Sequence, residues 1–517
     1  MTISQSEIWA QGLSRTQEQL ADLIPLDTQK ALVDRALTMQ PTLARLRQLV
    51  TVHARMGNLA AARSLLDQIP RFQWSQIGPD SSWHDDMRAQ LNGPNLAAAG
   101  DPSDRLVIAF AFPPFANASG NVMARRIEAM GRRVDVISND MSGRELLDRS
   151  LYGAISPLIG QHLVLDCENW PARSAPFADF ADKTVAALAS GRFGRSSYPE
   201  VYSRAMWAQS HFAAAALLAA GRAARWVAEF SDPCRVNLNG QQDGALADDA
   251  WLESSGIAAL LRQRGHAVPT QRTLMFWAEY LAFCLADRIT FTNAAQRDLM
   301  VSQAEDPPEI RARAAAISEV IPQPTPGSQI MAALPMPKPV RGPIWIGFFG
   351  NANPRRGLSG LLGALAQLPE PLRHKVRLHI HGKADPELRA TTREMGIAGM
   401  VQIWPSLDYL DALARMRMMD WLFVNDTAST AEFETSPYLP SKLADYKAAG
   451  RAVLAFAEPG SPLSQAELPA GSIRVDMTDD NAVLDAIIRI ASSGEQNLQS
   501  VTADGTWRAN SMDGIDP

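Results

Sequence analysis

Apolar residues in the first part of the chain recur at the three-to-four-residue spacing of helices. The pattern covers Ala31–Met39, Leu43–Met56 and Leu59–Ile69. A proline follows soon after two of these stretches, as expected where a helix cannot continue. We therefore predict an all-α helical domain over residues 1–95.

From residue 105 onward the pattern changes to short apolar runs that alternate with helical stretches. The run Arg105–Phe112 (RLVIAFAF) is almost continuously apolar, as expected of a strand buried on both faces of a parallel sheet. A loop, a helical stretch ending at Gly131 and another apolar run follow, which makes a strand–loop–helix–strand unit. This α/β domain is predicted over residues 105–325. Its further predicted elements are helices at Val122–Met130, Tyr202–Ala220 and Thr273–Ala286 and strands at Val134–Ile137, His162–Leu165, Arg225–Phe230 and Arg288–Thr292.

Seven prolines lie between residues 322 and 343, a density that no core strand or helix tolerates. We predict a Pro-rich linker over residues 326–343. A second alternation of strands and helices follows over residues 344–492, and the polar residues 493–517 predict a flexible tail. The predicted elements of this second domain are strands at Ile344–Gly350, Val376–His381, Met400–Trp404, Trp421–Val424 and Ala452–Phe456 and a helix at Leu358–Leu368.

These elements predict an α/β fold with two Rossmann-like domains that face a cleft, preceded by an all-α helical domain. In open parallel sheets, ligands bind beyond the carboxyl ends of the strands. Since a Pro-rich hinge joins the two domains, we expect the ligand site in the cleft between them.

The composition narrows the classes of function. Hydrophobic residues make up 46% of the chain and charged residues 20%, which excludes global disorder. The net charge of −6 argues against sequence-independent binding to nucleic acid. Three cysteines without a C-x-x-C pair support neither a zinc site nor a disulfide framework. No secretion signal or membrane span is recognisable, so we expect a cytoplasmic protein with at most peripheral membrane association.

The strongest local signal for chemistry is the segment Ser436–Val453 (SPYLPSKLADYKAAGRAV). Its prolines prevent a helix at first, and a helix can then run from Ser441 to Ala449. Lys442 and Asp445 are three residues apart, so they share one face near the start of that helix. A helix N-terminus with a lysine can hold anionic oxygens, and a carboxylate one turn on can accept from ribose hydroxyls. The same two side chains could instead form an exposed ion pair.

This segment resembles the donor-site motif of family 4 glycosyltransferases, retaining enzymes with two Rossmann-like domains (the GT-B fold). The family commonly writes the motif as P-x-K-x-x-E-Y-x-A-x-G-x-P-V. The resemblance implies that Ser441 and Lys442 lie at the donor and that Asp445, in place of the family's Glu, binds the ribose. Ala452 replaces the family's Pro. At the motif positions this chain has Pro440, Lys442, Asp445, Tyr446, Ala448, Gly450, Ala452 and Val453.

Further stretches of the C-terminal domain fit the same resemblance. The loop Gly350–Gly357 (GNANPRRG) stands where the family binds the donor diphosphate with basic side chains. Arg356 matches the family's Lys, and Asn351 stands where the family has an earlier basic residue. Arg355 can supply that charge instead, since a guanidinium fork suits phosphate oxygens. The two arginines could also be a solvated turn. Gly382, at a predicted strand end, is expected beside the nucleotide.

Stretches of the N-terminal domain match family segments that face the donor and the acceptor. Gly120 and Asn121 (in SGN) resemble the family's glycine-rich loop, where glycine lets the backbone approach a ligand. Glu229 and Asp232 (in AEFSDP) match the carboxylates of a D-F-R-D-P-type strand end. His211 lies in a stretch that faces the cleft in the family. The alternatives are an ordinary helix start, two capping carboxylates and a structural histidine.

One altered position of the family pattern bears on catalysis. Retaining members often carry an E-x7-E pair at the donor site, and counting back from Asp445 gives Pro437 in place of Glu. Glu432 and Glu434 precede that position, and we favour Glu434. The catalytic residues expected from the resemblance are Arg356, Lys442 and Glu434.

The resemblance implies transfer of a sugar from a nucleoside diphosphate sugar (a UDP- or GDP-sugar) to an acceptor hydroxyl in glycan or polysaccharide biosynthesis. Transfer is expected to proceed with retention, without a permanently bound cofactor and without a metal. A glycan, a lipid-linked glycan and a protein are the expected classes of acceptor. Sugar phosphorolysis is a weaker rival, because neither a pyridoxal lysine nor an inorganic-phosphate pocket is recognisable.

An alternative from another class is a catalytically degenerate GT-B scaffold that binds a protein partner through residues 1–95. The altered E-x7-E pair and Asn351 favour it, and the lysine motif and the arginine pair oppose it. The stretch LVTVHARMGNLAAARSLLDQIP resembles a tetratricopeptide repeat, although a plain helical hairpin fits as well. A repeat of this kind would favour a macromolecular partner.

Overall fold

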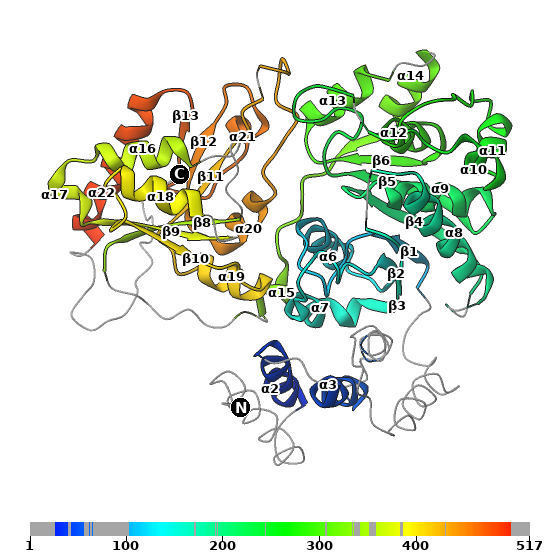
Figure 1. Ribbon diagram of the computed structural model, residues 1–517, viewed down its shortest axis with the longest axis horizontal. Coiled ribbons are helices and arrows are strands. Elements are labelled where there is room, and N and C mark those ends of the chain that lie inside the picture. Colours follow the sequence, from blue (N-terminus) through cyan, green and yellow to red (C-terminus); the bar gives the residue numbers. More distant parts are fainter. Residues whose placement is uncertain are drawn as a thin grey trace, which may run out of the picture. The chain divides into compact units, whose positions relative to one another are not determined.

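The chain divides into two compact units, residues 1–333 with 408–410 and residues 334–407 with 411–517. Each unit is built on one parallel sheet. Among the described helices, none is long and apolar enough to cross a membrane. The computed structural model describes residues 26–39, 43–55, 62, 65, 103–169, 172–191, 193, 195–242, 244–304, 308–332, 334, 342–350, 358–382, 386–429 and 431–497 (Figure 1).

The described part of the predicted helical domain is a pair of helices, α2 (Leu26–Met39) and α3 (Leu43–Arg55). The two helices pack against each other, and apolar side chains such as Val33 and Val50 are fully buried. The helical spacing of the sequence predicts both. Of the third predicted helix, Leu59–Ile69, the structure describes two residues, both helical and buried. The tetratricopeptide resemblance stays a prediction.

The helix pair contacts α7 (Arg149–Ile155) of the same unit. Lys30 forms an ion pair with Asp34 one helical turn on, at 2.6 Å. A Cβ added at Gly153 would stand 2.6 Å from the Lys30 ammonium nitrogen, so a larger residue there would displace the lysine. These groups and His53 line a small cavity at the junction. Charged as well as apolar side chains therefore hold the helix pair against α7.

The first unit carries a seven-stranded, all-parallel sheet in the order β3-β2-β1-β4-β5-β6-β7. The chain starts in the middle of the sheet, builds outward to β3 and returns to place β4 on the other side of β1. The strands are β1 (Arg105–Ile108), β2 (Val134–Asn139), β3 (Ile159–Leu165), β4 (Tyr198–Ala205), β5 (Ala223–Phe230), β6 (Arg288–Phe291) and β7 (Ser318–Val320).

One predicted element is wrong. The sequence pattern predicts a helix over Tyr202–Ala220, but its first residues belong to β4, and α9 (Gln209–Ala219) begins after a turn at Met206–Ala208. β4 lies between β1 and β5, and the second half of the strand is buried throughout. It therefore lacks the alternation of a half-exposed strand, and its apolar run merges with that of α9.

Helices pack on both faces of this sheet, as right-handed crossovers require. α9 packs on β4 and β5, with α8 (Ala175–Ala189) and α12 (Leu274–Leu285) beside it (Figure 1). The connections from β1 to β3 run through α6 (Ala118–Met130) and α7, which pack against each other. The remaining helices of the unit are α10 (Asp249–Ser254), α11 (Ile257–Gln263), α13 (Ala294–Ser302), α14 (Pro308–Ala316) and α15 (Ser328–Ala332), with a short 3-10 turn at Ser156–Leu158.

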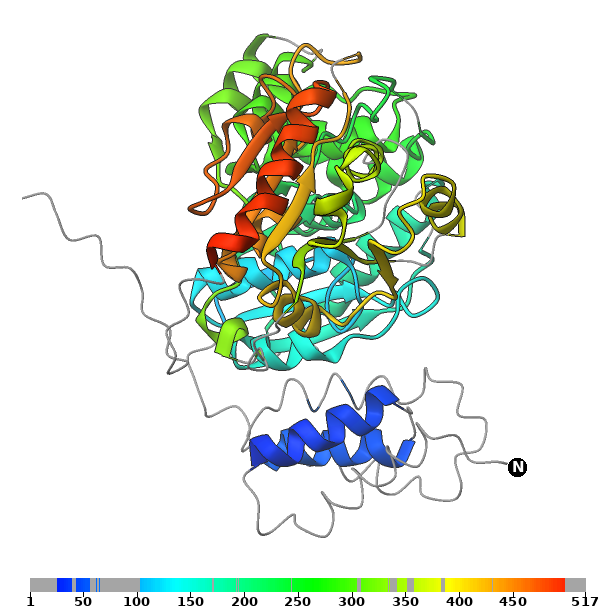
Figure 2. The same ribbon diagram turned by 90° about the vertical axis from the view of Figure 1, so that its left-hand side faces the viewer.

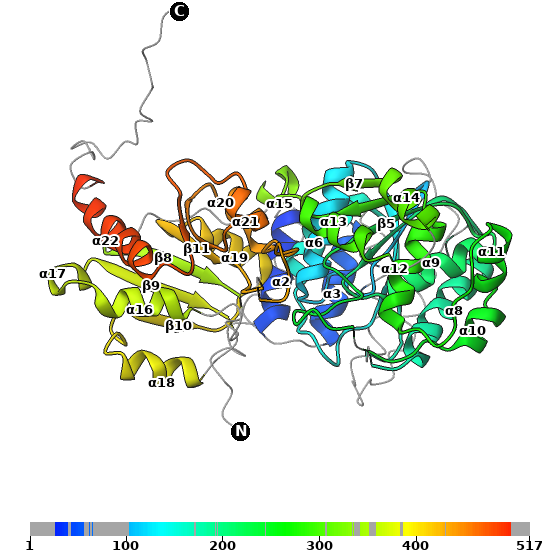
Figure 3. The ribbon, with the colours of Figure 1, turned by 90° about the horizontal axis from the view of Figure 1, so that it is seen from above.

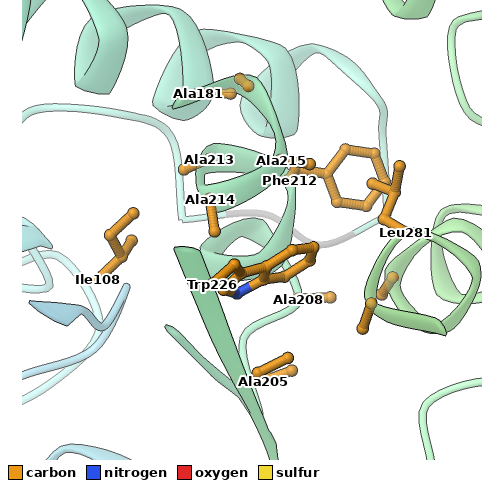
Figure 4. Packing of buried hydrophobic residues seen from close by; sticks show 14 of the residues in the cluster. Ile108, Ala181, Ala205, Ala208, Phe212, Ala213, Ala214, Ala215, Trp226 and Leu281 are labelled. Carbon is orange, nitrogen blue, oxygen red and sulfur yellow. The ribbon is translucent and has the colours of Figure 1, made fainter. Parts of the chain in front are cut away.

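In the core of the first unit, α9 packs directly on the sheet. α9 is rich in alanine, and its central alanines are buried. Figure 4 shows Ala214 above the ring of Trp226 on β5, with Phe212 and Leu281 to one side. The small side chains of the helix leave room for the large indole ring, so the two fill one layer between them.

The second unit carries a six-stranded parallel sheet in the order β10-β9-β8-β11-β12-β13. Figure 3 shows α16 (Ser359–Gln367) and α22 (Asp480–Asn497) on one side of the strands and α20 (Lys442–Ala449) and α21 (Pro462–Gln465) on the other. α22, in red, runs along the sheet in Figure 2. The other elements are β8 (Ile344–Phe349), β9 (Val376–His381), β10 (Val401–Trp404), β11 (Trp421–Asn425), β12 (Ala452–Ala457), β13 (Ile473–Asp476), α17 (Glu370–Arg373), α18 (Pro386–Glu394) and α19 (Tyr409–Met416).

The two parallel sheets confirm the predicted α/β fold class with two Rossmann-like units. Each sheet reverses its strand order once, between β1 and β4 in the first unit and between β8 and β11 in the second. Beyond the carboxyl ends of such neighbouring strands the loops diverge and leave room for a ligand. Side chains at these two places are therefore the first candidates for ligand contacts. The predicted domain limits and the cleft stay predictions.

The packing of α9 generates a first test. Ala214 is fully buried, so Ala214→Leu forces extra volume into a filled layer, and we expect it to lower the free energy of unfolding by about 1–3 kcal/mol. Urea unfolding measures the change. Ala220→Leu, at the exposed end of the same helix, is the control and should change it by less than about 0.5 kcal/mol. Equal unfolding midpoints for the two variants would contradict this packing.

Candidate functional site

Lys442 lies at the carboxyl end of β8, where the second sheet reverses its order. Its ammonium nitrogen stands 3.8 Å from the centre of the Phe348 ring, a cation–π contact. A Cβ added at Gly350 would come within 3.4 Å of the same nitrogen. Gly350 has a φ of +131°, a backbone conformation that favours glycine. The fold therefore brings together two residues that the sequence analysis assigns to the donor site.

The helix that carries Lys442 begins and ends where the sequence predicts. α20 runs to Ala449, and Gly450 ends it with a left-handed φ of +66°. Ser441, Lys442 and Asp445 are half-buried at the helix start. The positive end of the helix dipole is also there, so this surface favours a negatively charged ligand.

Tyr446 fixes α20 to the first strand of the sheet. Its hydroxyl oxygen accepts the backbone N–H of Phe349 at 3.2 Å, and the two rings pack edge-on at 6.4 Å. The tyrosine is fully buried, and burial raises the pKa of its hydroxyl. Because Tyr446 lies one turn after Lys442, this bond sets the position of the lysine over β8.

Three stacked rings run along the carboxyl ends of β8, β9 and β10. The ring of His381 is 5.0 Å from that of Phe349, with 9° between the planes, and 6.4 Å from that of Trp404, with 15°. The N–H of Gly382 donates to the Trp404 carbonyl at 3.2 Å, and the N–H of Gly350 to the His381 carbonyl at 2.8 Å. Burial lowers the pKa of His381 to about 4, so its ring is neutral at pH 7. Trp404 is 47% exposed and offers a flat face beside Gly382.

Two buried carboxylates hold the loop that carries Glu434. Asp426 accepts the backbone N–H of Glu458 at 2.9 Å and the hydroxyl of Ser461 at 2.5 Å. Glu458 in turn accepts the backbone N–H and the hydroxyl of Ser429 at 2.9 and 3.0 Å. These bonds tie the loop after β11 to the loop after β12. Glu434 itself is exposed between them and α20.

Three residues that the sequence analysis assigns to the donor site lie outside the described residues. They are Asn351, Arg355 and Arg356, which follow Gly350 in the chain. Their roles stay predictions. Among the described residues, no three His, Cys, Asp or Glu side chains gather as metal ligands would.

In the first unit, Asn117 caps the start of α6. Its side-chain oxygen accepts the backbone N–H groups of Ser119 and Gly120 at 2.9 and 3.4 Å, and its carbonyl accepts the N–H of Asn121 at 2.9 Å. A Cβ added at Gly120 would stand 3.0 Å from the Cα of Phe112. Glycine therefore lets α6 approach the backbone that follows β1. The amides of Ser119, Gly120 and Asn121 have partners within the chain, and the predicted ligand contacts of Gly120 and Asn121 stay predictions.

Glu229 is fully buried near the carboxyl end of β5, between two arginines. Arg126 donates to both of its oxygens at 3.3 and 3.0 Å, and Arg204 donates to one at 3.3 Å. The hydroxyl of Tyr202 donates to the same carboxylate. Burial would raise the pKa of Glu229, but the two guanidinium groups outweigh it and hold the pKa below its usual value. The carboxylate is thus ionised. Because it is fully buried, it can affect an acceptor only through the residues that bond to it.

His211 is fully buried in α9. Its Nδ1 lies 2.8 Å from the hydroxyl of Ser203, which also accepts the indole N–H of Trp226 at 2.7 Å. The imidazole packs edge-on against Phe230 at 4.8 Å. Burial lowers the pKa of His211 to about 3, so the ring is neutral and joins the helix to β4 and β5. Asp232, in the loop after β5, is only half-buried.

Several buried charged residues were not recognised from the sequence, among them Arg126, Arg204, Asp426 and Glu458. Arg126 follows another arginine in a helix, a pattern typical of a solvated face, and Arg204 lies in the stretch wrongly predicted as helix. Asp426 and Glu458 each follow a buried apolar strand directly. A carboxylate at that position is a usable signal, because the carboxyl ends of parallel strands gather the polar groups of the fold.

No protein-family model matches the chain. No curated protein matches it in sequence. Among solved structures, HepE from Anabaena in complex with UDP-glucose is 13% identical over 77% of this chain and 91% of its own, with a TM-score of 0.46. Sucrose-phosphate synthase from Thermosynechococcus elongatus is 14% identical over 77% and 94%, with a TM-score of 0.46. A protein assigned as a UDP-N-acetylglucosamine 2-epimerase from Listeria monocytogenes is 11% identical over 78% and 92%, with a TM-score of 0.47. Similarities of this size assign no reaction to this chain, so its function must be inferred from its own residues.

The ion pairs of Glu229 generate a test with a pH dependence. Glu229→Gln leaves two buried guanidinium groups without their carboxylate, so we expect a loss of about 3–5 kcal/mol in the free energy of unfolding at pH 7. The pKa of Glu229 is lower in the folded than in the unfolded chain. Its contribution is therefore fully present above the unfolded pKa, near 4.5, and is lost as the pH falls through the folded pKa.

Urea unfolding at a series of pH values measures this difference between wild type and variant. It should be largest at neutral pH and shrink below pH 4.5. Glu253→Gln is the control, because Glu253 pairs with Arg262 at the surface, where solvent screens the two charges and the pair contributes little to stability. A Glu229→Gln variant as stable as Glu253→Gln at neutral pH would show that the buried carboxylate does not hold the arginines.

Proposed function

We propose that the chain is a glycosyltransferase that moves a sugar from a nucleoside diphosphate sugar to an acceptor hydroxyl. The observation that carries the proposal is the position of Lys442. Its ammonium lies over the Phe348 ring beside Gly350, at the start of α20 and at the place where the second sheet reverses its order. It belongs to the sequence segment that resembles the donor-site motif of family 4 glycosyltransferases.

The donor's leaving diphosphate gains negative charge in the transition state. Preorganised cations and helix-start amides stabilise such charge more than water does. In this proposal Lys442 and Arg356 face the diphosphate, and Arg355 adds to that charge. Asp445 accepts from the ribose hydroxyls and so orients the donor. The remaining donor-binding residues are Gly350, Asn351, Gly382, Ser441 and Gly120.

The proposed acceptor side is the first unit. Asn121 and Asp232 are half-buried at its carboxyl edge, and in this proposal both contact the acceptor. Glu229 and His211 are fully buried, so they act as positioning residues for the strand and helix that carry them. Glu434 is the proposed catalytic carboxylate. Its exposed loop joins the buried carboxylates to α20, and retention at the anomeric carbon is part of the same proposal.

Finer parts of the proposal follow the sequence resemblance. The donor is a UDP- or GDP-sugar of the hexosyl type, no metal is required, and a glycan, lipid-linked or protein acceptor receives the sugar in the cytoplasm. A second candidate is a degenerate scaffold that binds a protein partner through residues 1–95. Pro437, in place of the family's first glutamate, is the observation that favours it. Loss of partner capture on removal of residues 1–95, with no binding of nucleotide sugars, would support the scaffold.

Turnover in matched variants tests the glycosyltransferase. We expect Lys442→Ala and Asp445→Ala each to lower the rate of donor hydrolysis or transfer by at least about 100-fold, because each removes a preorganised contact to the donor. Lys447→Ala is the control. Lys447 lies in the last turn of the same helix, away from its positive end, and should keep nearly the full rate.

Thermal unfolding of each variant shows whether the fold is intact. Full activity in both Lys442→Ala and Asp445→Ala would contradict the site assignment. Equal losses in these variants and in Lys447→Ala would assign the effect to the stability of α20 rather than to the donor.

A further inference from the structure

Arg204 is a buried arginine on β4 that reaches three other elements. Its Nε donates to Glu229 on β5 at 3.3 Å. Its Nη1 donates to the hydroxyl of Ser119 in the first turn of α6 at 2.5 Å, and its Nη2 to the hydroxyl of Ser231 after β5 at 3.0 Å. The guanidinium group therefore fixes two serines at the carboxyl ends of the strands, where the first sheet reverses its order.

Each of these serine hydroxyls still has a proton to donate. An arginine only donates, so the hydroxyls of Ser119 and Ser231 accept from Arg204 and keep their own O–H. Among the described residues, neither O–H has an acceptor, since the bond from Arg204 is the one hydrogen bond that each hydroxyl makes. The serines are 6% and 7% exposed, at an edge where Ala118 is exposed and Asp232 half-buried. Two donors thus lie at a rim that a ligand oxygen can reach.

The charge around Arg204 is not balanced. The buried network has two guanidinium groups, on Arg126 and Arg204, against the one carboxylate of Glu229. Tyr202 adds no charge, because burial and the nearby carboxylate raise the pKa of its hydroxyl well above the usual value. Asp232 follows Ser231 in the chain but forms no hydrogen bond with Arg204 within the described part of the structure. An excess buried positive charge is costly unless an anion compensates it.

We propose that Ser119 and Ser231, polarised by Arg204, form an oxyanion subsite for the acceptor. Both hydroxyls donate to one phosphate or carboxylate group of the acceptor, and Arg204 supplies the compensating charge from behind them. The acceptor is then an anionic molecule, such as a phosphorylated or carboxylated glycan. The proposal rests on the proposed function, since it names the acceptor of the same reaction. Arg204 itself is a positioning residue, because it acts through the serines.

Inorganic phosphate is the probe for this subsite. The full chain is titrated with phosphate by calorimetry at constant ionic strength, with and without a saturating nucleotide in the donor site. The nucleotide is UDP, or GDP if the chain binds GDP and not UDP, and it is called UDP below. We expect the double variant S119A/S231A to bind phosphate about tenfold more weakly than wild type with UDP present, because it loses two hydrogen bonds to an anion. Ser254→Ala, at an exposed hydroxyl that bonds within α10, is the control and should bind as wild type does.

The conservative pair S119T/S231T keeps both hydroxyls and should restore most of the binding, which a merely structural loss would not predict. Equal affinities of S119A/S231A and wild type would overturn the subsite. A dependence on the serines that disappears when UDP is bound would assign the anion to the donor's diphosphate and overturn the acceptor assignment. If neither UDP nor GDP binds, the proposed function fails, while the phosphate titration without nucleotide still decides whether the serines hold an anion.

Discussion

An all-parallel sheet must be covered by helices on both faces, and this requirement shapes the rest of the chain. Strands buried on both sides carry apolar residues along most of their length, as β1 and β12 do. Polar side chains that could contact a ligand are therefore expected at the strand ends. Both sheets reverse their order once, and at that point the loops diverge. Among the described candidate site residues, Gly120 follows β1 in the first unit, and Gly350 and Lys442 lie at the end of β8 in the second.

The two units use these positions differently. In the first unit, charges are buried and paired, and Glu229 and Arg204 hold the helix start and the strand end in one arrangement. In the second unit, an aromatic row and a fixed lysine face the strand ends. A buried ion network holds geometry, whereas Lys442 is half-buried and its ammonium contacts an aromatic ring. In the proposed function, the first unit forms the acceptor side and the second unit the donor side.

Much of the fold could be predicted from the sequence, because its signals are local. Gly131 and Gly450 mark the ends of α6 and α20, and the predicted strand Val376–His381 coincides with β9. The helix predicted over Tyr202–Ala220 is wrong in its first part. That part belongs to a strand, and a strand buried on both faces shows no alternation of apolar and polar residues. Lys442 and Gly350 lie side by side although they are far apart in the chain. No local pattern predicts this, and only the family resemblance assigned both residues to the donor site.

The buried partners could not be predicted, since their meaning depends on contacts between distant strands. Arg126 and Glu229 are about a hundred positions apart, and each alone is an ordinary charged residue. Glu458 likewise matters only because Ser429 lies across from it. A sequence pattern indicates the residue types that a reaction needs. Which of them are positioned by buried partners depends on the fold.

The central claim is that the carboxyl edge of the second sheet binds the diphosphate of a nucleotide sugar. Thermal unfolding of the full chain with UDP-, GDP-, ADP- and dTDP-sugars tests it most directly. The account predicts that sugars of one base stabilise the protein, by about 2.7 kcal/mol at one hundred times the dissociation constant, and that Lys442→Ala loses this stabilisation. A folded sample that none of the four donors stabilises would contradict the account.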